Sequence, residues 1–305
     1  MSSHIINGFL NIEKPHGITS MEAIRRIKRV TNQKKIGHGG TLDPNAVGVL
    51  PICFGQATRL MNYLINGRKQ YRALIELGLS TDTYDSAGKI VKECELPDIT
   101  KKQIQDLLKF YIGTIEQIPP MYSALKKQGR RLYEFARAGI EIDREARLVE
   151  VFDIVVEKWE NPLLTINIEC GRGFYVRSIA HDIGESLGCG AYLKDLTRIR
   201  SGSFHITDSI PLLEFEKQGV EDKWREHVYP LDFVLKYLKA MIVGQNIETF
   251  ISNGRFLTQN FHVPGLDTKE DCRVYSVDGR FIGLANFDNS VGQWKPIKVF
   301  SSIHK

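Results

Sequence analysis

The sequence predicts an α+β protein built on an antiparallel or mixed sheet, and three observations lead to that fold class. Strand-like and helix-like segments are mixed along the chain, but without the regular βαβ alternation that a doubly wound fold needs. The strand-like segments 148–157 and 163–170 are joined through Asn161-Pro162, which is typical of a hairpin. After about residue 238, strand and turn signals dominate, which indicates a small separate β unit.

Composition excludes several classes of protein. The 305 residues suit about two domains, and 42% hydrophobic with 25% charged residues is typical of a globular chain. No stretch approaches the ~20 apolar residues of a membrane span, and residues 1–17 lack the pattern of a signal peptide. We therefore expect a cytoplasmic protein without a membrane partner. The five cysteines are scattered and contain no C-x-x-C pair, which argues against a disulfide framework or a zinc ribbon.

The first elements are a strand and a helix. Residues 8–14 form a strand-like run that Pro15 and Gly17 end. Thr19 or Ser20 is then a suitable N-cap for a helix, whose apolar residues recur at helical spacing: Met21, Ile24, Ile27 and Val30. The other face of this helix is basic, and its simplest interpretation is a solvated surface.

The middle of the chain contains further elements of both kinds. Residues 70–79 alternate as a strand should. Thr100 and Gln103 form a capping-box pattern before an apolar run, and Gly113 suits the end of that helix. Residues 175–187 are predicted to form a helix that Gly188 closes. Near the C-terminus, 273–277 and 280–285 flank the hairpin turn Asp278-Gly279, and 296–300 is a further strand. We expect this last unit to be a small β-barrel.

The positive charge is concentrated in one segment. The whole chain has a formal net charge of only +5, which permits a polyanionic partner without requiring one. Residues 117–139 contain Tyr122, Tyr133 and one acidic residue, Glu134, among five basic residues: Lys126, Lys127, Arg130, Arg131 and Arg137. Clustered cations match phosphates and aromatic rings stack on bases, so this segment favours nucleic-acid binding. An exposed loop-helix insertion without that role fits the composition equally well.

A glycine-rich segment, 35–44, is the densest motif. Three glycines in four positions, Gly37, Gly39 and Gly40, allow close approach of the backbone to a ligand. No Gly-Lys-Ser/Thr follows and the third glycine of a dinucleotide fingerprint is missing, so a nucleotide-dependent transferase is poorly supported. Taken alone, Asp43 before Pro44 would be a turn former and His38 a loop histidine.

Arg177 stands where a helix usually prefers an anion. It falls in the first turn of the predicted helix after Gly171-Arg172-Gly173-Phe174, although helix N-termini favour negative charge. A cation held there indicates a carboxylate partner from elsewhere in the chain. The sequence contains no catalytic-triad order and no His-Glu-x-x-His, so metal catalysis and acyl transfer have no support.

Together these motifs resemble the TruB family of tRNA pseudouridine synthases. The similarity runs through residues 8–210 in the family's order, beginning with Lys14-Pro15 and Gly17-Ile18-Thr19-Ser20. It continues through Gly37-His38-Gly39-Gly40-Thr41-Leu42-Asp43-Pro44 with Gly48-Val49-Leu50-Pro51, Lys69-Gln70-Tyr71-Arg72-Ala73, Thr81-Asp82-Thr83-Tyr84-Asp85, Ile118-Pro119-Pro120-Met121-Tyr122, Gly173-Phe174-Tyr175-Val176-Arg177 and Leu196-Thr197-Arg198. Gly39 and Phe174 stand where threonine is usual, and neither is a catalytic position.

The resemblance implies a fold, a reaction and a set of residues. It implies a pseudouridine synthase fold over 1–238 with a basic RNA-gripping insertion at about 117–147, and a PUA-like RNA-binding barrel over 239–305. The implied reaction converts uridine 55 in the T loop of tRNA to pseudouridine, with no cofactor and no metal. Asp43, Tyr71 and Arg177 would be catalytic. Other residues would bind the substrate (Lys14, His38, Gly40, Asp85, Tyr175, Leu196) or the RNA (Lys126, Lys127, Arg130, Arg131). A monomer without an obligate protein partner is expected.

The residue types suit this chemistry. Isomerisation breaks the N1–C1′ bond of uridine and joins C5 to the same sugar carbon, so nothing is oxidised, but a carboxylate must attack or remove a proton. Attack at C1′, attack at C6 and deprotonation of the sugar are all open to Asp43. A paired Arg177 would keep that carboxylate ionised and oriented. The alternative from another class is an RNA-binding or tRNA-folding factor on the same scaffold, for which turnover is not required.

Overall fold

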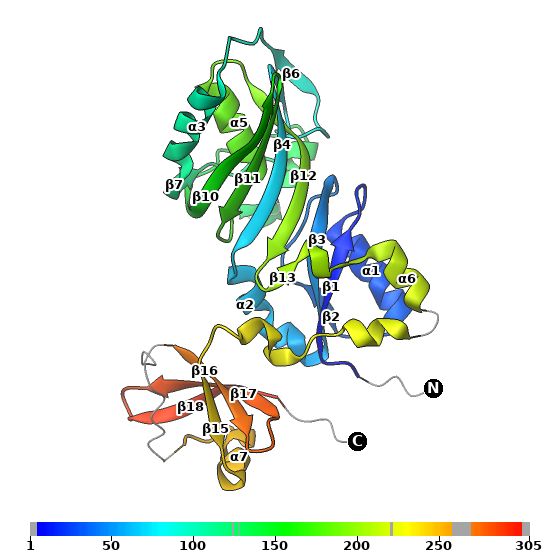
Figure 1. The fold of residues 1–305 in the computed structure, drawn as a ribbon, viewed down its shortest axis with the longest axis vertical. Helices are drawn as coiled ribbons and strands as arrows, with labels where there is room; N and C mark the ends of the chain where they lie inside the picture. The colour runs from blue at the N-terminus through cyan, green and yellow to red at the C-terminus, as the bar shows by residue number, and fades with distance from the viewer. Residues whose placement is uncertain (1–4, 124, 128, 220–221, 258–269, 301–305) are drawn as a thin grey trace.

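The structure is a computed structural model that describes residues 5–123, 125–127, 129–219, 222–257 and 270–300 (Figure 1). Its α-helices are α1 (Ser20–Thr31), α2 (Met61–Asn66), α3 (Lys101–Leu108), α4 (Leu132–Arg137), α5 (Val176–Ser186), α6 (Leu212–Gln218) and α7 (Gln245–Ser252). Its strands are β1 (Gly8–Lys14), β2 (Ile36–His38), β3 (Ala46–Phe54), β4 (Lys69–Leu77), β5 (Leu79–Thr81), β6 (Ile90–Glu93), β7 (Gly113–Gln117), β8 (Lys126–Lys127), β9 (Arg130–Arg131), β10 (Arg147–Glu160), β11 (Leu163–Cys170), β12 (Ala191–Ser201), β13 (Phe204–His205), β14 (Ile210–Pro211), β15 (Ala240–Val243), β16 (Asp271–Ser276), β17 (Phe281–Asp288) and β18 (Gln293–Val299).

A ten-stranded sheet forms the centre of the molecule. Its strands lie in the order β14-β1-β3-β12-β4-β11-β10-β7, while β2 pairs with β3 and β13 with β12. The β1–β14 and β3–β12 pairs are parallel, and the other pairs are antiparallel. The predicted α+β class with a mixed, mainly antiparallel sheet is therefore confirmed. The parallel β3–β12 pair brings the loop before β3 against β12.

The two halves of this sheet are covered differently (Figure 1). In the half formed by β4, β11 and β10, the helices α3 and α5 cover one face, and a core that includes Ile75, Ile166, Ile168 and Ile179 lies beneath them. In the other half, β1 and β3 are buried on both faces. Leu10 and Ile52 pack toward α1 and α6, whereas Phe9 and Cys53 belong to a separate cluster. β1 and β3 therefore have apolar side chains packed on both faces of the sheet.

Local signals explain most element boundaries. The Thr19 hydroxyl accepts a hydrogen bond from the Glu22 N–H at the start of α1, as predicted. Met21, however, is 53% exposed, so its expected place in the core was wrong. Ser20 turns inward instead, because its hydroxyl bonds the backbone of Leu42. The capping box of Thr100 and Gln103 at the start of α3 is also present.

Three other predicted elements are present, and one of them, a strand, is shorter than expected. The strand predicted over 70–79 ends at Leu77, because Gly78 has a positive φ of 91° and β5 turns away to pair with β6. The predicted hairpin is confirmed as β10 and β11, whose antiparallel ladder reaches from Val151–Cys170 to Glu160–Leu163. The helix α5 ends before Gly188, which has a φ of 75°.

The described residues of the C-terminal unit do not form the all-β barrel that the sequence suggested. In its described residues, β15-β16-β17-β18 form an open four-stranded sheet with β15 and β18 at the edges, and α7 packs on it. The antiparallel β16–β17 hairpin around Gly279 was predicted correctly. Leu284 and Phe300 pack with Phe9 and Val49 of the large domain. Residues 258–269 and 301–305 of the expected 239–305 unit lie outside the described residues.

None of the helices in the described part of the chain combines the length and the hydropathy needed to cross a membrane.

Candidate active site

A cleft of about 280 Å³ opens beside the middle of the large sheet. Most of its lining comes from four segments that are distant in sequence: the loop between β2 and β3, the start of β4, the turn into α5, and β12; Ile65 and Ser123 complete it. Six of the residues predicted to act on the substrate line this cleft: Gly40, Asp43, Tyr71, Tyr175, Arg177 and Leu196. A cleft of this volume, lined by charged and aromatic side chains, is suitable for one small ligand that contains a flat ring.

Asp43 lies at the rim of the cleft, in the loop that enters β3. Close packing of β3 against β12 shapes this loop: a Cβ on Gly48 would lie 2.4 Å from the Arg198 carbonyl oxygen, and Gly48 has a φ of 101°. Only glycine fits there without a shift of backbone. The parallel register Leu196–Ala46 and Arg198–Gly48 then brings Leu196 beside the loop that carries Asp43.

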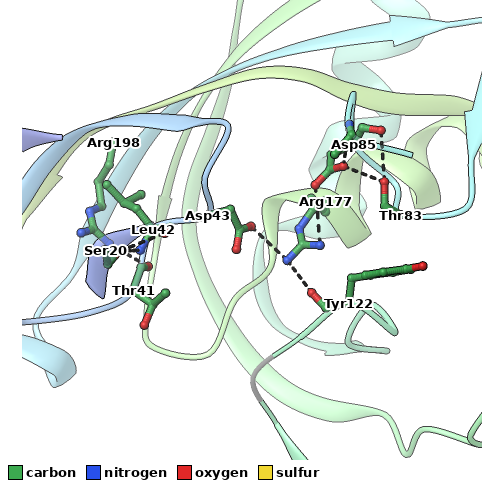
Figure 2. Close-up of polar contacts among 10 residues, drawn as sticks. Ser20, Thr41, Leu42, Asp43, Thr83, Asp85, Tyr122, Arg177 and Arg198 are labelled. Atoms are coloured by element: carbon green, nitrogen blue, oxygen red, sulfur yellow. Dashed lines mark hydrogen bonds and ion pairs between the residues drawn. The ribbon is translucent and has the colours of Figure 1, made fainter. Parts of the chain in front are cut away.

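Arg177 joins Asp43 to a second carboxylate. Its Nη2 lies 2.9 Å from Oδ2 of Asp43 and its Nη1 lies 3.7 Å from Oδ2 of Asp85, as Figure 2 shows. The same Nη2 donates to the carbonyl of Tyr122 at 3.0 Å. The Arg177 side chain is 6% exposed, whereas that of Asp43 is 42% exposed. A buried, fixed cation thus orients a carboxylate that a ligand can still reach.

The carboxylate partner that the position of Arg177 indicated is therefore present, and there are two of them. Asp85 is held from behind, because the Thr83 hydroxyl donates to its Oδ1 at 2.6 Å and the Ala87 N–H donates at 3.0 Å. Asp85 lies outside the cleft lining, beside a smaller cavity that also touches Asp43 and Leu196. Asp85 is therefore a second carboxylate partner of Arg177, and it lies outside the cleft lining.

Two tyrosines and a leucine provide the flat and apolar part of the cleft. Tyr71 of β4 lies opposite Ile168 of β11 and Arg198 of β12 in the ladders. Burial raises the pKa of Tyr71, against the opposing effect of the Arg198 charge, so its phenol is protonated at neutral pH. Burial likewise raises the pKa of Tyr175, although the Ser123 hydroxyl favours its ionised form. A protonated, half-buried ring is suited to stack on a nucleobase.

His38 does not belong to the glycine-rich loop itself. It is the last residue of β2, and its Nδ1 accepts a hydrogen bond from the Gly40 N–H at 3.4 Å. Burial lowers the pKa of His38, the nearby Arg198 charge lowers it further, and the Gly40 hydrogen bond opposes both. His38 is therefore a neutral ring next to the cleft, outside its lining.

Lys14 points at the backbone and not into the cleft. Its ammonium group is fully buried and donates to the carbonyls of Pro15 and Ile18 at 2.8 Å and of Pro44 at 3.2 Å. Burial lowers its pKa to about 8, against the attraction of Asp43, while Arg198 adds to the lowering. Lys14 thus holds the loop just after Asp43.

This lowered pKa predicts a pH-dependent stability. Between pH 8 and 10.5 the unfolded Lys14 keeps a proton that the folded Lys14 has released, so the free energy of unfolding rises with pH in that window. Relative to Lys14→Met, the wild type should gain about 2 kcal/mol between pH 7.5 and 9.5. Urea unfolding of both proteins at several pH values measures this difference. A difference that does not change with pH would contradict the lowered pKa.

The basic insertion lies apart from the cleft. Lys126, Lys127, Arg130 and Arg131 form a two-stranded hairpin, β8 and β9, which precedes α4. Arg130 lies over the ring of Phe135, and Arg131 over that of Tyr133. None of these four cations lines the cleft, but Ser123, at the start of the same insertion, does. The insertion therefore links a cationic surface to the edge of the cleft.

Sequence reasoning missed two buried cations and one hydroxyl. Arg198 and Lys69 both line the cleft, and Ser20 bonds the backbone of Leu42. Burial lowers the pKa of Lys69 to about 8, and its ammonium group donates to carbonyls at the end of α2. These buried cations could have been found from the sequence as charged residues at strand positions where the alternating pattern expects a buried apolar side chain. In β12 that signal is lost, because register shifts between Leu193 and Asp195 and between Arg198 and Arg200 interrupt the alternation.

Family models, sequence relatives and a solved structure are each similar to most of this chain. The family model described as "TruB family pseudouridylate synthase (N terminal domain)" matches residues 28–176, and "tRNA pseudouridylate synthase B C-terminal domain" matches residues 177–236. A tRNA pseudouridine synthase B of Dehalococcoides mccartyi is 40% identical over 97% of each chain. One from Clostridium acetobutylicum is 38% identical over 92% of this chain and 96% of its own. A chain in the crystal structure of a Cbf5-Nop10-Gar1 complex superposes with a TM-score of 0.73 at 26% identity, over 98% of this chain and 85% of that one.

Proposed function

This chain belongs to the TruB family and is a tRNA pseudouridine synthase, and from that premise we propose that Asp43 is the carboxylate that acts on uridine 55 in the T loop of tRNA. The observation that carries the proposal is the Asp43–Arg177 ion pair at the rim of the cleft. Asp43 is the more exposed partner, so it can reach a nucleoside while Arg177 stays fixed. Tyr71, Tyr175 and Leu196 supply the surface on which the base would lie.

The reaction needs little beyond a positioned carboxylate and a place for the base to turn. The N1–C1′ bond of uridine breaks, the uracil rotates, and C5 bonds to C1′. The proton on C5 leaves to solvent and N1 gains one, so atoms and electrons balance. Asp43 can attack C1′, attack C6 or take a proton from the sugar. In each case the Arg177 guanidinium keeps the carboxylate ionised and pointing at the substrate.

The neighbouring residues have distinct roles in this proposal. Tyr71 stacks on the uracil and holds it during rotation, a contact worth ~1–3 kcal/mol. Leu196 and Tyr175 limit the movement of the detached base, and the small Gly40 leaves room for its edge. Lys14, His38 and Asp85 lie behind the cleft lining, and we assign them to the loop and to Arg177 instead of to the base.

The target uridine must leave its stack to enter the cleft. Extrusion of a nucleotide costs a few kcal/mol, which contacts to the rest of the RNA must offset. His38 is a neutral ring at the end of β2. In this proposal it occupies or stacks on the space that the uridine leaves in the RNA. The hairpin of Lys126, Lys127, Arg130 and Arg131 would hold the tRNA backbone, because paired RNA is recognised mainly by its shape and phosphates.

Neutralising this hairpin should weaken tRNA binding and flatten its salt dependence. Changing all four cations, Lys126, Lys127, Arg130 and Arg131, to glutamine removes up to four phosphate contacts, each contributing about 0.7–0.9 to the slope of log K against log salt. Filter binding between low and physiological salt measures this slope. Glutamine at Lys101 and Lys102 of α3 and at Lys109, the C-cap of that helix, is the control, since these exposed lysines lie on or next to a helix that covers the sheet. An unchanged slope in the hairpin variant would mean that the RNA is held elsewhere.

The remaining predictions concern domains and partners. We propose a synthase domain over 1–238 with its insertion at about 117–147, and a PUA-like RNA-binding unit over 239–305. The contact of Leu284 and Phe300 with the large domain supports a C-terminal unit held in a fixed place for a tRNA arm. We further propose a cytoplasmic monomer without an obligate protein partner. Size-exclusion chromatography with light scattering tests the monomer.

One experiment tests reaction and position together. Unmodified tRNA with tritium at C5 of uridine is incubated with the protein, tritium release is counted, and the altered nucleotide is mapped. Release in proportion to pseudouridine at position 55 is the expected result. A tRNA-folding factor on the same scaffold would bind this RNA without releasing tritium, and release from another uridine would overturn the assignment to position 55.

A further inference from the structure

The backbone around Asp43 is held at every carbonyl. The five carbonyls from Gly40 to Pro44 all accept hydrogen bonds from residues that the structure describes. The Asp43 carbonyl accepts from the Ala46 N–H at 3.1 Å, within the loop. The Leu42 carbonyl accepts from the Ser20 hydroxyl at 3.0 Å, and the Pro44 carbonyl accepts from the Gly17 N–H at 2.9 Å. The other two, at Gly40 and Thr41, are both bonded by Arg198.

Arg198 spans the loop on both sides of Asp43. Its Nη2 donates to the Gly40 carbonyl at 3.1 Å and its Nη1 to the Thr41 carbonyl at 3.4 Å, before Asp43. Its Nε donates to the Val49 carbonyl at 2.7 Å, after Asp43. Figure 2 shows Arg198 beside Thr41 and Leu42, on the opposite side of Asp43 from Arg177. One side chain thus connects the two arms of the loop whose tip is Asp43.

Arg198 has no acidic partner among the described residues. It is 1% exposed, and within the ranges that the structure covers no carboxylate lies within 4 Å of its guanidinium. Its charge is solvated by the three carbonyls instead. A buried guanidinium is expensive to desolvate, and a neutral side chain would be cheaper if the position served packing alone. Packing alone therefore does not account for Arg198, and the directions of its N–H donors toward the three carbonyls do.

The position of Arg198 is fixed by the sheet as well. Arg198 lies opposite Gly48 in the parallel β3–β12 pair and opposite Tyr71 in the antiparallel β4–β12 pair. Its backbone is so close to Gly48 that a side chain could not fit between them. The guanidinium is therefore a rigid link from the sheet to the loop, and it lies next to the strand that carries Tyr71.

We propose that Arg198 is a positioning residue for the isomerisation: its planar fork holds the backbone before and after Asp43, so that the carboxylate keeps a fixed place between Arg177 and the bound nucleoside. The inference rests on the proposed role of Asp43. Arg177 orients the side chain of Asp43 from one side, and Arg198 orients its main chain from the other. Three carbonyls that lie in different directions require a fork with several donors, which the single ammonium of lysine does not provide.

The test separates the rate of the chemical step from tRNA affinity. Arg198→Lys keeps the charge but loses the fork, so its single-turnover rate of tritium release should fall by about 10- to 100-fold, the range expected when a reacting group is misplaced by about 1 Å. Its Kd for tRNA should stay within about twofold, since Arg198 is only 1% exposed and its three guanidinium nitrogens already donate to backbone carbonyls. Arg26→Lys is the matched control: Arg26 also donates through its planar fork, to both carboxylate oxygens of Glu216, but it links α1 to α6 and lies outside the cleft lining. It should retain the wild-type rate.

A second variant covers the case in which Arg198→Lys does not fold. Ser20→Ala keeps Arg198 but frees the Leu42 backbone, and it should lower the rate by a smaller factor, about 3- to 10-fold, with unchanged Kd. Thermal melts establish the temperature at which each variant is folded. A wild-type rate in folded Arg198→Lys, or a loss of affinity equal to the loss of rate, would overturn the inference. If Arg198→Lys is unfolded, a wild-type rate in Ser20→Ala would overturn it. Full turnover in Asp43→Asn would instead refute the proposed function itself, so the two failures are distinguishable.

Discussion

Asp43→Asn should form no measurable pseudouridine. The amide cannot supply the charged oxygen that attacks or takes a proton, so we expect the single-turnover rate to fall by at least about 10⁴-fold, as when other enzymes lose an essential catalytic group. The change is nearly isosteric, and Asp43 makes its ion pair from an exposed position, so the fold and the tRNA Kd should change little. Tritium release with enzyme in excess measures the rate, and filter binding measures Kd.

Asp85→Asn provides an informative comparison for that variant. Asp85 pairs with the same Arg177 at the longer distance of 3.7 Å, from outside the cleft lining. Its loss should lower the rate through Arg177, by much less than the loss of Asp43. Retained turnover in Asp43→Asn would remove Asp43 from the chemistry. Equal losses in the two variants would mean that both carboxylates act only by holding Arg177.

Arg177→Lys should lower the rate by about 10³-fold, toward the upper end of what removal of one fixed electrostatic contact costs an enzyme. Arg177 reaches Asp43, Asp85 and the Tyr122 carbonyl with two nitrogen atoms of one planar group. An ammonium group could satisfy one of the carboxylates but could not bridge both in the same geometry. The measurements are the single-turnover rate and thermal unfolding, because Arg177 is also buried.

The matched control for this variant is Arg172→Lys. Arg172 lines the same cleft five residues earlier, but it is exposed, and its Nη1 donates to Asn66 at 3.1 Å. We expect its effect on the chemical step to be within a few fold. Near-normal activity of folded Arg177→Lys would show that the position requires only positive charge, and a bridging role for Arg177 between the two carboxylates would then be wrong.

Local interactions made much of the fold predictable. The cap at Thr19, the capping box of Thr100 and Gln103 and the turn at Gly279 each depend on residues within three or four positions, so their sequence patterns are short and specific. Predictions failed where a distant partner competed. In α1, Ser20 faces inward and bonds Leu42, 22 residues away in sequence, while the neighbouring Met21 is exposed. The helix α7 interrupts a segment whose strand and turn signals favoured an all-β unit.

The candidate site was likewise predictable only in part from the sequence. The motifs around Asp43, Tyr71 and Arg177, together with their resemblance to one family, indicated these residues before any fold was known. The anomalous place of Arg177 at the start of a helix also indicated a carboxylate partner, without saying which one. The tertiary structure then decides that Asp43, Asp85 and Arg177 meet: β12 lies beside β3, which follows Asp43, and Leu193 of β12 forms a bridge with Asp85.

By itself, the sequence determined the fold class, the family and the residue types available for the reaction, since these depend on short patterns and on the order of motifs along the chain. Only the tertiary structure decided which charges face the cleft and which face the backbone. Lys14 and Arg198 are both cations of family motifs, yet both are buried against carbonyls of the Asp43 loop. Burial and the direction of hydrogen bonds are properties of packed strands, and no local pattern in the chain encodes them.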